Sequence, residues 1–104
     1  MKTIKQKKFK FQDVTWTIKW VDQIDSENES LIYGRTQFDT LEILISTKLN
    51  GNDIPLIVQE RTLYHELIHM ILDENQFNSE SRCESLVEAI AKGIYELKHK
   101  TNLL

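Results

Sequence analysis

The first half of the chain alternates between hydrophobic and polar positions, and this period of two is typical of β-strands. The alternation runs over residues 8–11, breaks at two polar residues and resumes over residues 14–20. A short polar break between two such runs predicts a hairpin of two strands. We expect its second strand to place four apolar residues on one face, namely Val14, Trp16, Ile18 and Trp20.

Further stretches in this half complete a small sheet. Residues 22–30 are polar and acidic and indicate a loop, after which residues 31–33 lead into Gly34. Residues 41–46 form another alternating apolar run, which predicts a strand. A glycine within such a pattern indicates a bend, or a place where another backbone approaches closely.

The second half of the chain changes to the period of a helix. A turn signal at residues 50–53 precedes a helix over residues 55–73, and a polar connection leads to a second helix over residues 80–98. This order of strands followed by helices predicts an α+β fold, with a short antiparallel sheet of three to four strands packed on two helices. The apolar stripe of the second helix consists of Leu86, Ile90, Gly93 and Leu97, with Val87 and Ile94 flanking it.

Composition places the chain among ordinary globular proteins and limits the partners and the cellular compartment that we expect. At 104 residues it is long enough for a single domain, residues 1–104, with one modest core. The formal net charge of −3 gives no electrostatic reason to expect nucleic acid as a partner. The single cysteine, Cys83, excludes an intrachain disulfide and indicates a reducing compartment. No apolar run approaches the ~18 residues of a membrane span, and no signal peptide is recognisable, so we expect a cytoplasmic protein without a membrane anchor.

One motif in the first predicted helix specifies chemistry, since residues 65–69 read His-Glu-Leu-Ile-His. At about 100° per residue, His65 and His69 lie one turn apart on the same stripe, with Glu66 beside them. Imidazole nitrogens suit zinc, which in catalytic sites leaves one of its four positions to water. Apolar residues surround the motif, and unpaired polar groups in such an interior helix would cost roughly 1–3 kcal/mol each. The pattern therefore favours a zinc site over a helix that merely carries two histidines.

Two histidines do not complete a zinc site, so a third donor must come from another element. The second helix carries Glu84 and Glu88 on one face, and a short connection between antiparallel helices brings Glu84 to the level of His69. We favour Glu84 as the third ligand, with Glu88 holding the far nitrogen of a ligand histidine. Cys83 and Glu80 remain alternative donors.

Glu84 also has a purely structural interpretation. Ser81 and Glu84 have the spacing of a capping box, in which the glutamate would bond back to the backbone amide of Ser81. A helix that begins earlier, at Asn78 or Ser79, removes that role. The start of the second helix therefore decides between the two interpretations.

The motif together with residues 84–88, which read Glu-Ser-Leu-Val-Glu, resembles the gluzincin arrangement, in which a second helix supplies the third ligand and an acidic partner. Over about residues 31–97 the chain resembles small phage and prophage proteins related to the ImmA/IrrE family of metallopeptidases. The resemblance implies a minimal zincin-like core and a Zn²⁺ cofactor. It also implies a protein or peptide substrate, for which a transcriptional repressor is a candidate, in the cytoplasm of a bacterial host. The segments that carry it are Tyr33–Thr36, Leu41–Ser46, Thr62–His69 and Val87–Ala91.

Two departures from the gluzincin arrangement limit what the resemblance implies about the substrate cleft and about oxyanion stabilisation. The interval from His69 to Glu84 is only 15 positions, so the subdomain that builds the substrate cleft of large gluzincins is missing. No residue matches the one that steadies the transition-state oxyanion in those enzymes. The candidates for that role are Tyr33, Arg35 and Tyr95.

The sequence thus predicts a zinc-dependent metallopeptidase. His65, His69 and Glu84 would hold zinc, and Glu66 would act as general base toward a zinc-bound water that attacks the peptide carbonyl. The substrate would pair through main-chain hydrogen bonds with an exposed edge strand, for which we expect residues 41–46. One alternative is a phage-related, zinc-containing regulatory or protein-binding module with little or no proteolysis, and another is a metal-free structural protein. Glu66 favours chemistry, because a structural zinc site has no use for a carboxylate that is not a ligand.

Overall fold

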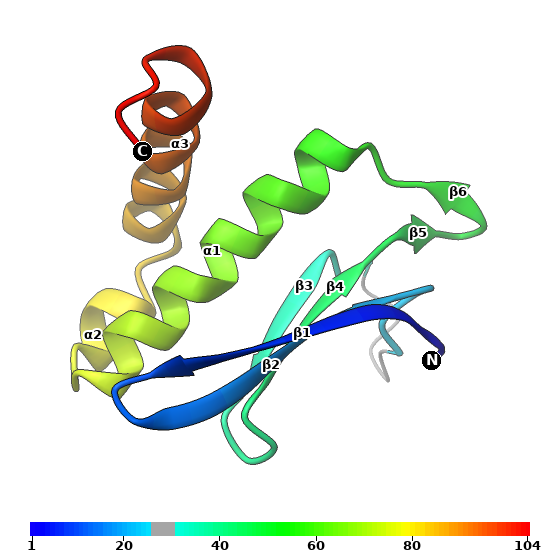
Figure 1. Ribbon diagram of the computed structural model, residues 1–104, viewed down its shortest axis with the longest axis horizontal. Helices are drawn as coiled ribbons and strands as arrows, with labels where there is room; N and C mark the ends of the chain where they lie inside the picture. Colours follow the sequence, from blue (N-terminus) through cyan, green and yellow to red (C-terminus); the bar gives the residue numbers. More distant parts are fainter. Residues whose placement is uncertain (26–30) are drawn as a thin grey trace.

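A four-stranded sheet is covered on one face by a long helix, and a further helix lies beside the long one (Figure 1). The structure is a computed structural model that describes residues 1–25 and 31–104. The strands of the sheet are β1 (Thr3–Phe11), β2 (Val14–Val21), β3 (Gly34–Gln37) and β4 (Glu42–Ser46). A ribbon of β5 (Lys48–Leu49) and β6 (Asn52–Asp53) leads into α1 (Leu56–Glu74), α2 (Asn78–Ser81) and α3 (Glu84–Lys100). The predicted α+β class is confirmed.

The predicted hairpin is formed by β1 and β2, which pair antiparallel with Phe9 opposite Trp16. Gln12 and Asp13 form its turn with φ of 50° and 66°, the left-handed region that the favoured two-residue hairpin turn uses at both positions. The predicted apolar face of β2 packs beneath α1, and these side chains set the distance between the helix and the sheet. The main core between them consists of Trp16, Ile18, Ile43, Ile45 and Met70.

The strand predicted over residues 41–46 does not lie at an edge. It forms β4, which pairs parallel with β2 and antiparallel with β3, so the strand order is β1-β2-β4-β3. The sheet is therefore mixed rather than wholly antiparallel. An inner position suits this strand because both of its faces are covered, with Ile43 and Ile45 toward α1 and Leu44 packed with Ile24 on the other side. The expectation that residues 41–46 offer an exposed edge to a substrate is wrong, and the edge strands are β1 and β3.

The helices follow the predicted bounds, except that the second one is interrupted. The first helix, expected over residues 55–73, spans residues 56–74. The second, expected over residues 80–98, is divided into α2 and α3 because Cys83 has an extended backbone, with φ of −84° and ψ of 90°. Three helices rather than two therefore follow the sheet, and Glu84 becomes the first residue of a new helix.

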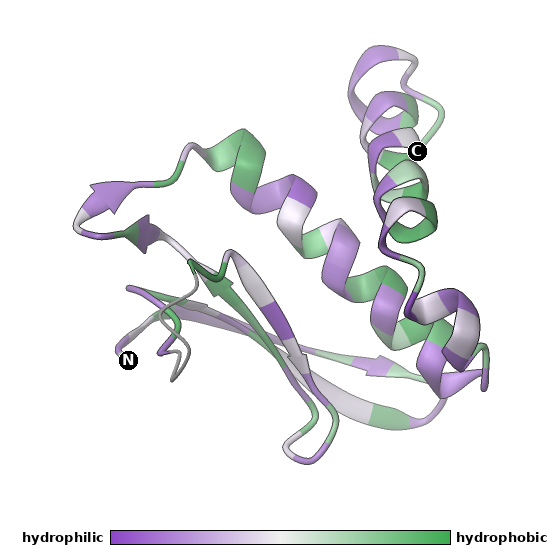
Figure 2. Ribbon diagram, turned by 180° about the vertical axis from the view of Figure 1, so that it is seen from behind, coloured by the Kyte–Doolittle hydropathy of each residue, from purple (hydrophilic) through white to green (hydrophobic). Residues whose placement is uncertain are grey.

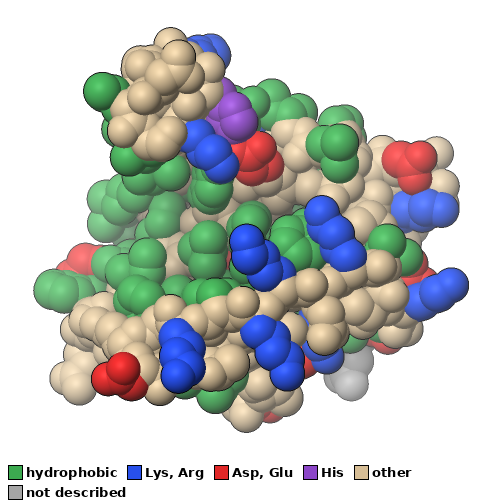
Figure 3. Space-filling model, viewed as in Figure 1, with side chains coloured by type: hydrophobic (Ala, Val, Ile, Leu, Met, Phe, Trp, Pro, Cys, Tyr) green, Lys and Arg blue, Asp and Glu red, His purple; other side chains and the backbone are tan. Residues whose placement is uncertain are grey.

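The buried face of α3 also differs from the prediction. Val87 and Ala91 are buried against α1, whereas Leu86, Ile90 and Leu97 of the predicted stripe are 37–39% exposed. Figure 2 gives the reason, since α3 lies beside α1 and away from the sheet, so that only the stripe facing α1 is covered. Figure 3 accordingly shows hydrophobic side chains lying open between α3 and the strands.

Two further predictions concern single segments. The loop expected over residues 22–30 is described only in part: residues 23–25 have no regular secondary structure, and residues 26–30 lie outside the described residues. Within residues 1–25 and 31–104, no helix has the length and apolar character needed to cross a membrane.

Candidate metal centre

Two faces of α1 are apolar, because this helix packs against both the sheet and α3. One stripe packs against the sheet through Leu67 and Met70, and a second packs against α3 through Ile68. The face between them carries the histidines of the motif, and the side chains of His65 and His69 are 19% and 16% exposed. Both imidazoles are therefore held by packing yet remain accessible from outside.

Three donor atoms converge between α1 and α3. The Nε2 atom of His65 lies 2.9 Å from Oε2 of Glu84, and the Nε2 atom of His69 lies 3.1 Å from Oε1 of the same carboxylate. The two Nε2 atoms are 3.2 Å apart. Glu84 reaches them because α3 begins beside the second half of α1, and its side chain is 67% exposed.

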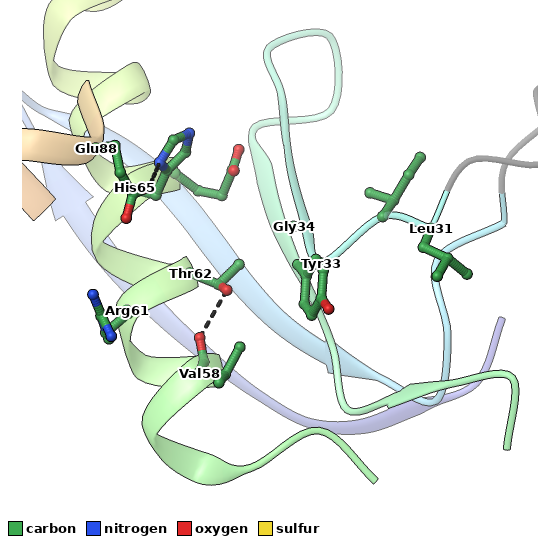
Figure 4. A pocket seen from close by; sticks show the side chains of 10 residues that line it. Leu31, Tyr33, Gly34, Val58, Arg61, Thr62, His65 and Glu88 are labelled. Carbon is green, nitrogen blue, oxygen red and sulfur yellow. Dashed lines mark hydrogen bonds and ion pairs between the residues drawn. The ribbon is translucent and has the colours of Figure 1, made fainter. Parts of the chain in front are cut away.

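The other nitrogen of each histidine has a hydrogen-bond acceptor of its own. Nδ1 of His65 lies 2.9 Å from Oε2 of Glu88 (Figure 4), and Nδ1 of His69 lies 3.0 Å from Oγ of Ser81. Ser81 donates its hydroxyl proton to Oδ2 of Asp73 at 2.9 Å. A carboxylate only accepts, and Ser81 has no second proton to offer, so both Nδ1 atoms must be the donors.

These contacts decide which nitrogen of each imidazole is left for another partner. With Nδ1 donating to its own acceptor, each Nε2 faces Glu84, and in the neutral ring it carries a lone pair. The two Nε2 atoms and the carboxylate lie 2.9–3.2 Å from one another, and a metal ion or a proton on Nε2 would satisfy these contacts. Tetrahedral zinc with bonds of about 2.0–2.1 Å separates its donors by about 3.3 Å. The spacing and the chemistry of the donor set therefore fit zinc, although the roles of these residues as ligands stay predictions.

Glu66 lies beside the donor atoms without being one of them. It is 9% exposed, and its Oε1 accepts a hydrogen bond of 2.9 Å from Oγ1 of Thr36 in β3. The same hydroxyl lies 3.1 Å from the backbone oxygen of Glu66. Burial raises the pKa of the Glu66 carboxyl, and the hydrogen bond from Thr36 acts in the opposite direction. Thr36 thus holds the carboxyl group in place next to the histidines.

Gly34 allows β3 to lie close to this part of α1. A Cβ atom at this position would stand 2.6 Å from Cγ2 of Thr62 and 3.0 Å from Cγ of Glu66. Such distances are too short for any other residue unless these side chains, or β3 and α1 themselves, move. The predicted close approach is therefore present, and its partners are side chains of α1 rather than another backbone.

The donor group lies between two hollows on the open side of α1. Both are lined by His65 and Glu66. The first, of about 570 Å³, extends past Val58 toward the start of the helix, and the second, of about 440 Å³, extends to Asp73. An extended ligand can therefore lie along α1 on both sides of the histidines.

The three candidates for oxyanion stabilisation are placed differently. Tyr33 lines the first hollow and Arg35 lines the second. The guanidinium of Arg35 donates to the backbone oxygen of Asp25 at 3.2 Å. Tyr95 packs on His99, with ring centroids 4.5 Å apart, and lines neither hollow. Tyr33 and Arg35 therefore remain candidates by position.

The alternative donors lie outside the cluster. In the described part of the chain, the one group of candidate ligand atoms within 4.8 Å of one another is formed by His65, His69 and Glu84. Cys83 is exposed and, like Glu80, does not belong to that group. The structure therefore gives neither residue a place among the donors.

The contacts of Ser81 exclude the capping box and extend the site. Ser81 ends α2 and contacts Asp73 and His69, while α3 begins at Glu84 without a side-chain cap. The sequence did not indicate that Ser81 or Thr36 belongs to the site. Their contacts join separate elements of secondary structure, and the spacing of residues along one helix does not predict such contacts.

Comparison with protein-family models, curated proteins and solved structures finds no match to this chain. The resemblance to the ImmA/IrrE family therefore stays a prediction from the sequence. Fold and site together define a small α+β protein with a candidate metal centre between two helices.

Proposed function

We propose that this protein is a zinc-dependent peptidase in which His65, His69 and Glu84 hold the metal. The observation that carries the proposal is the convergence of both Nε2 atoms on the Glu84 carboxylate, at 2.9–3.2 Å from one another. Zinc bound there would supply Lewis acidity, which polarises a carbonyl group and brings the pKa of water toward ~7. Glu88 and Ser81 support this assignment because they hold each imidazole with Nε2 free for a metal.

The proposed role of Glu66 is that of general base. Its carboxylate is buried beside the donor atoms and anchored through one oxygen by Thr36. A carboxylate in that position can accept a proton from the attacking water and return it to the leaving amine. Thr36 is the positioning residue, because its hydroxyl acts on the reaction only by holding the Glu66 carboxylate.

The edge strand β3 is the proposed binding strand for a peptide substrate. It replaces residues 41–46 in this role because β4 lies inside the sheet, and among the described residues no strand pairs with the outer edge of β3. Thr36 and Gly34 connect this strand directly to Glu66. A peptide that adds to the edge through main-chain hydrogen bonds would thus pass in front of the donor group.

The setting of this activity follows from the resemblance to proteins related to ImmA/IrrE. We propose a protein or peptide substrate, with a transcriptional repressor as the candidate, in the cytoplasm of a bacterial host. The first test is metal analysis of the purified chain, with one zinc ion per chain expected. A mixed peptide library, read by mass spectrometry, then tests for cleavage.

Glu66→Gln separates chemistry from metal binding. The variant should keep zinc and the far-ultraviolet circular dichroism spectrum while cleavage falls by at least about a hundredfold. His65→Ala, as the matched comparison, should lose both zinc and cleavage. Cleavage by Glu66→Gln at the rate of the natural chain would contradict the proposed base.

A second candidate function is a zinc-containing regulatory or protein-binding module with little or no proteolysis. This function is favoured because two of the three candidates for oxyanion stabilisation have other partners. Arg35 donates to the Asp25 carbonyl, and Tyr95 packs on His99. Stoichiometric zinc without cleavage of any library peptide would support the module over the peptidase. The absence of bound zinc would contradict both.

A further inference from the structure

Arg61 is a half-buried cation that lines the first hollow. Its guanidinium carbon lies 5.6 Å from the ring centroid of Tyr95, so the cation is held over an aromatic ring. In residues 1–25 and 31–104, no acceptor forms a hydrogen bond or ion pair with it. Stacking on a ring leaves the N–H edges of a guanidinium open, and those edges match a carboxylate in a two-point contact.

The carboxylates nearest to Arg61 along the two helices are engaged elsewhere. Glu60 accepts a hydrogen bond of 2.5 Å from the hydroxyl of Tyr64 and is also paired with His99. Glu88 faces Nδ1 of His65 at 2.9 Å. The protein therefore places a cation in the hollow without using its own acids to neutralise it.

The rest of the hollow is apolar at the same end. Leu31 and Tyr33 are 53% and 46% exposed and lie across α1 from Arg61, while Val58 belongs to the floor between them (Figure 4). The acidic groups of the hollow, Glu66 and Glu88, lie one helical turn further along, beside the donor atoms. A negative ligand group is therefore favoured only at the Arg61 end.

We propose that the first hollow is a subsite for a substrate carboxylate, which pairs with Arg61 while the apolar part of the substrate packs on Leu31 and Tyr33. The inference rests on the proposed peptidase function and names its substrate class. Arg61 precedes His65 by four residues, or about 6 Å along the helix. An extended peptide covers that distance in about two residues. The acidic group would thus lie about two residues from the cleaved bond.

The carboxylate has two sources, a free C-terminus or an internal acidic side chain, and three acetylated tripeptides distinguish them. Their residues are alanine and leucine except for one glutamate in the third. The first ends in a free carboxylate, the second in an amide, and the third in an amide with glutamate at the middle position. Binding is measured by calorimetry with zinc-loaded Glu66→Gln protein, so that no peptide is consumed. At least one acidic peptide should bind about tenfold more tightly than the neutral amide.

The variant Arg61→Gln should remove this preference, and Lys92→Gln, which removes an exposed charge of α3 outside the hollow, should keep it. Preference for the free carboxylate identifies a C-terminal residue as the ligand, and preference for the glutamate peptide identifies an internal one. Equal affinities for the three peptides, a preference that survives Arg61→Gln, or no binding by any of them would each overturn the subsite. Cleavage by the natural chain is assayed separately, so a retained preference without cleavage rejects the peptidase while leaving the carboxylate site in place.

Discussion

The Nε2 atoms of His65 and His69 lie 3.2 Å apart, and each faces the carboxylate of Glu84. Where both rings carry their proton on Nδ1, the three groups are acceptors and repel one another unless a cation lies among them. The partners of the Nδ1 atoms, Glu88 and Ser81, prevent either ring from turning its proton inward without losing a hydrogen bond. The orientation of both Nε2 atoms toward Glu84 is therefore built into the fold, and its consequences can be measured.

Removal of Glu84 should reduce zinc affinity far more than removal of the neighbouring thiol. Glu84→Ala deletes one of three donors, so we expect a loss of more than about a hundredfold, whereas Cys83→Ser should bind zinc as the natural chain does. The measurement is competition with a chromophoric chelator at neutral pH. The opposite ranking would move the third ligand to Cys83.

Ser81→Ala should weaken zinc binding although Ser81 is not a proposed ligand. The change removes the acceptor for Nδ1 of His69 and breaks the link to Asp73, so an affinity loss of about 10- to 100-fold is expected. Ser85→Ala removes an exposed hydroxyl of α3 and serves as the matched control. Equal affinities for the two variants would show that Ser81 does not orient the imidazole.

Gly34→Ala and Gly93→Ala should change stability in opposite directions. The methyl group at position 34 would collide with Thr62 and Glu66, so unfolding free energy should fall by about 1–3 kcal/mol. At position 93, where nothing lies within 4 Å, alanine favours the helix and should add up to about 1 kcal/mol. Urea denaturation of both variants is the measurement. A stable Gly34→Ala protein would contradict the close contact of β3 with α1.

Glu60 should stabilise the fold only while it is ionised. Burial alone would raise its pKa, but hydrogen bonds from His99 and Tyr64 and the charge of Lys98 outweigh burial and lower the pKa. The lowered pKa means that the contribution is present above the ordinary pKa and is lost as the pH falls below about 4. Glu60→Gln should therefore destabilise the protein by about 1 kcal/mol at pH 7 and by less at pH 3. Glu96→Gln, at an exposed pair, should have little effect at either pH.

The local patterns predicted the elements well because each depends on residues close in sequence. The hairpin, the helix with the motif and the α+β class follow from periods of two and 3.6, and these parts are confirmed. The inner place of β4 depends on which strand lies beside which, and alternation in one strand carries no such information. The four consecutive buried residues of β4, Ile43 to Ser46, are the mark of a strand covered on both faces.

For the site, helix geometry predicted the convergence of His65, His69 and Glu84 because each lies at a fixed angle on its helix. It could not predict Thr36 or Ser81, since these reach the site from β3 and from the short α2. The face of α3 was predicted wrongly for a related reason. Leu86 and Ile90 form a good apolar stripe, but α1, which covers the buried face of that helix, lies against Val87.

The position of Glu84 on a different helix from the two histidines makes the metal a cross-link. α3 is attached to α1 by a narrow buried strip centred on Val87 and Ala91. An ion shared by the two helices would add its binding free energy to that attachment. Chelation should then expose the amide hydrogens of α3 to exchange while those of β2 and β4 stay protected. The lifetime of the folded chain in a cell would, in that case, follow the supply of zinc.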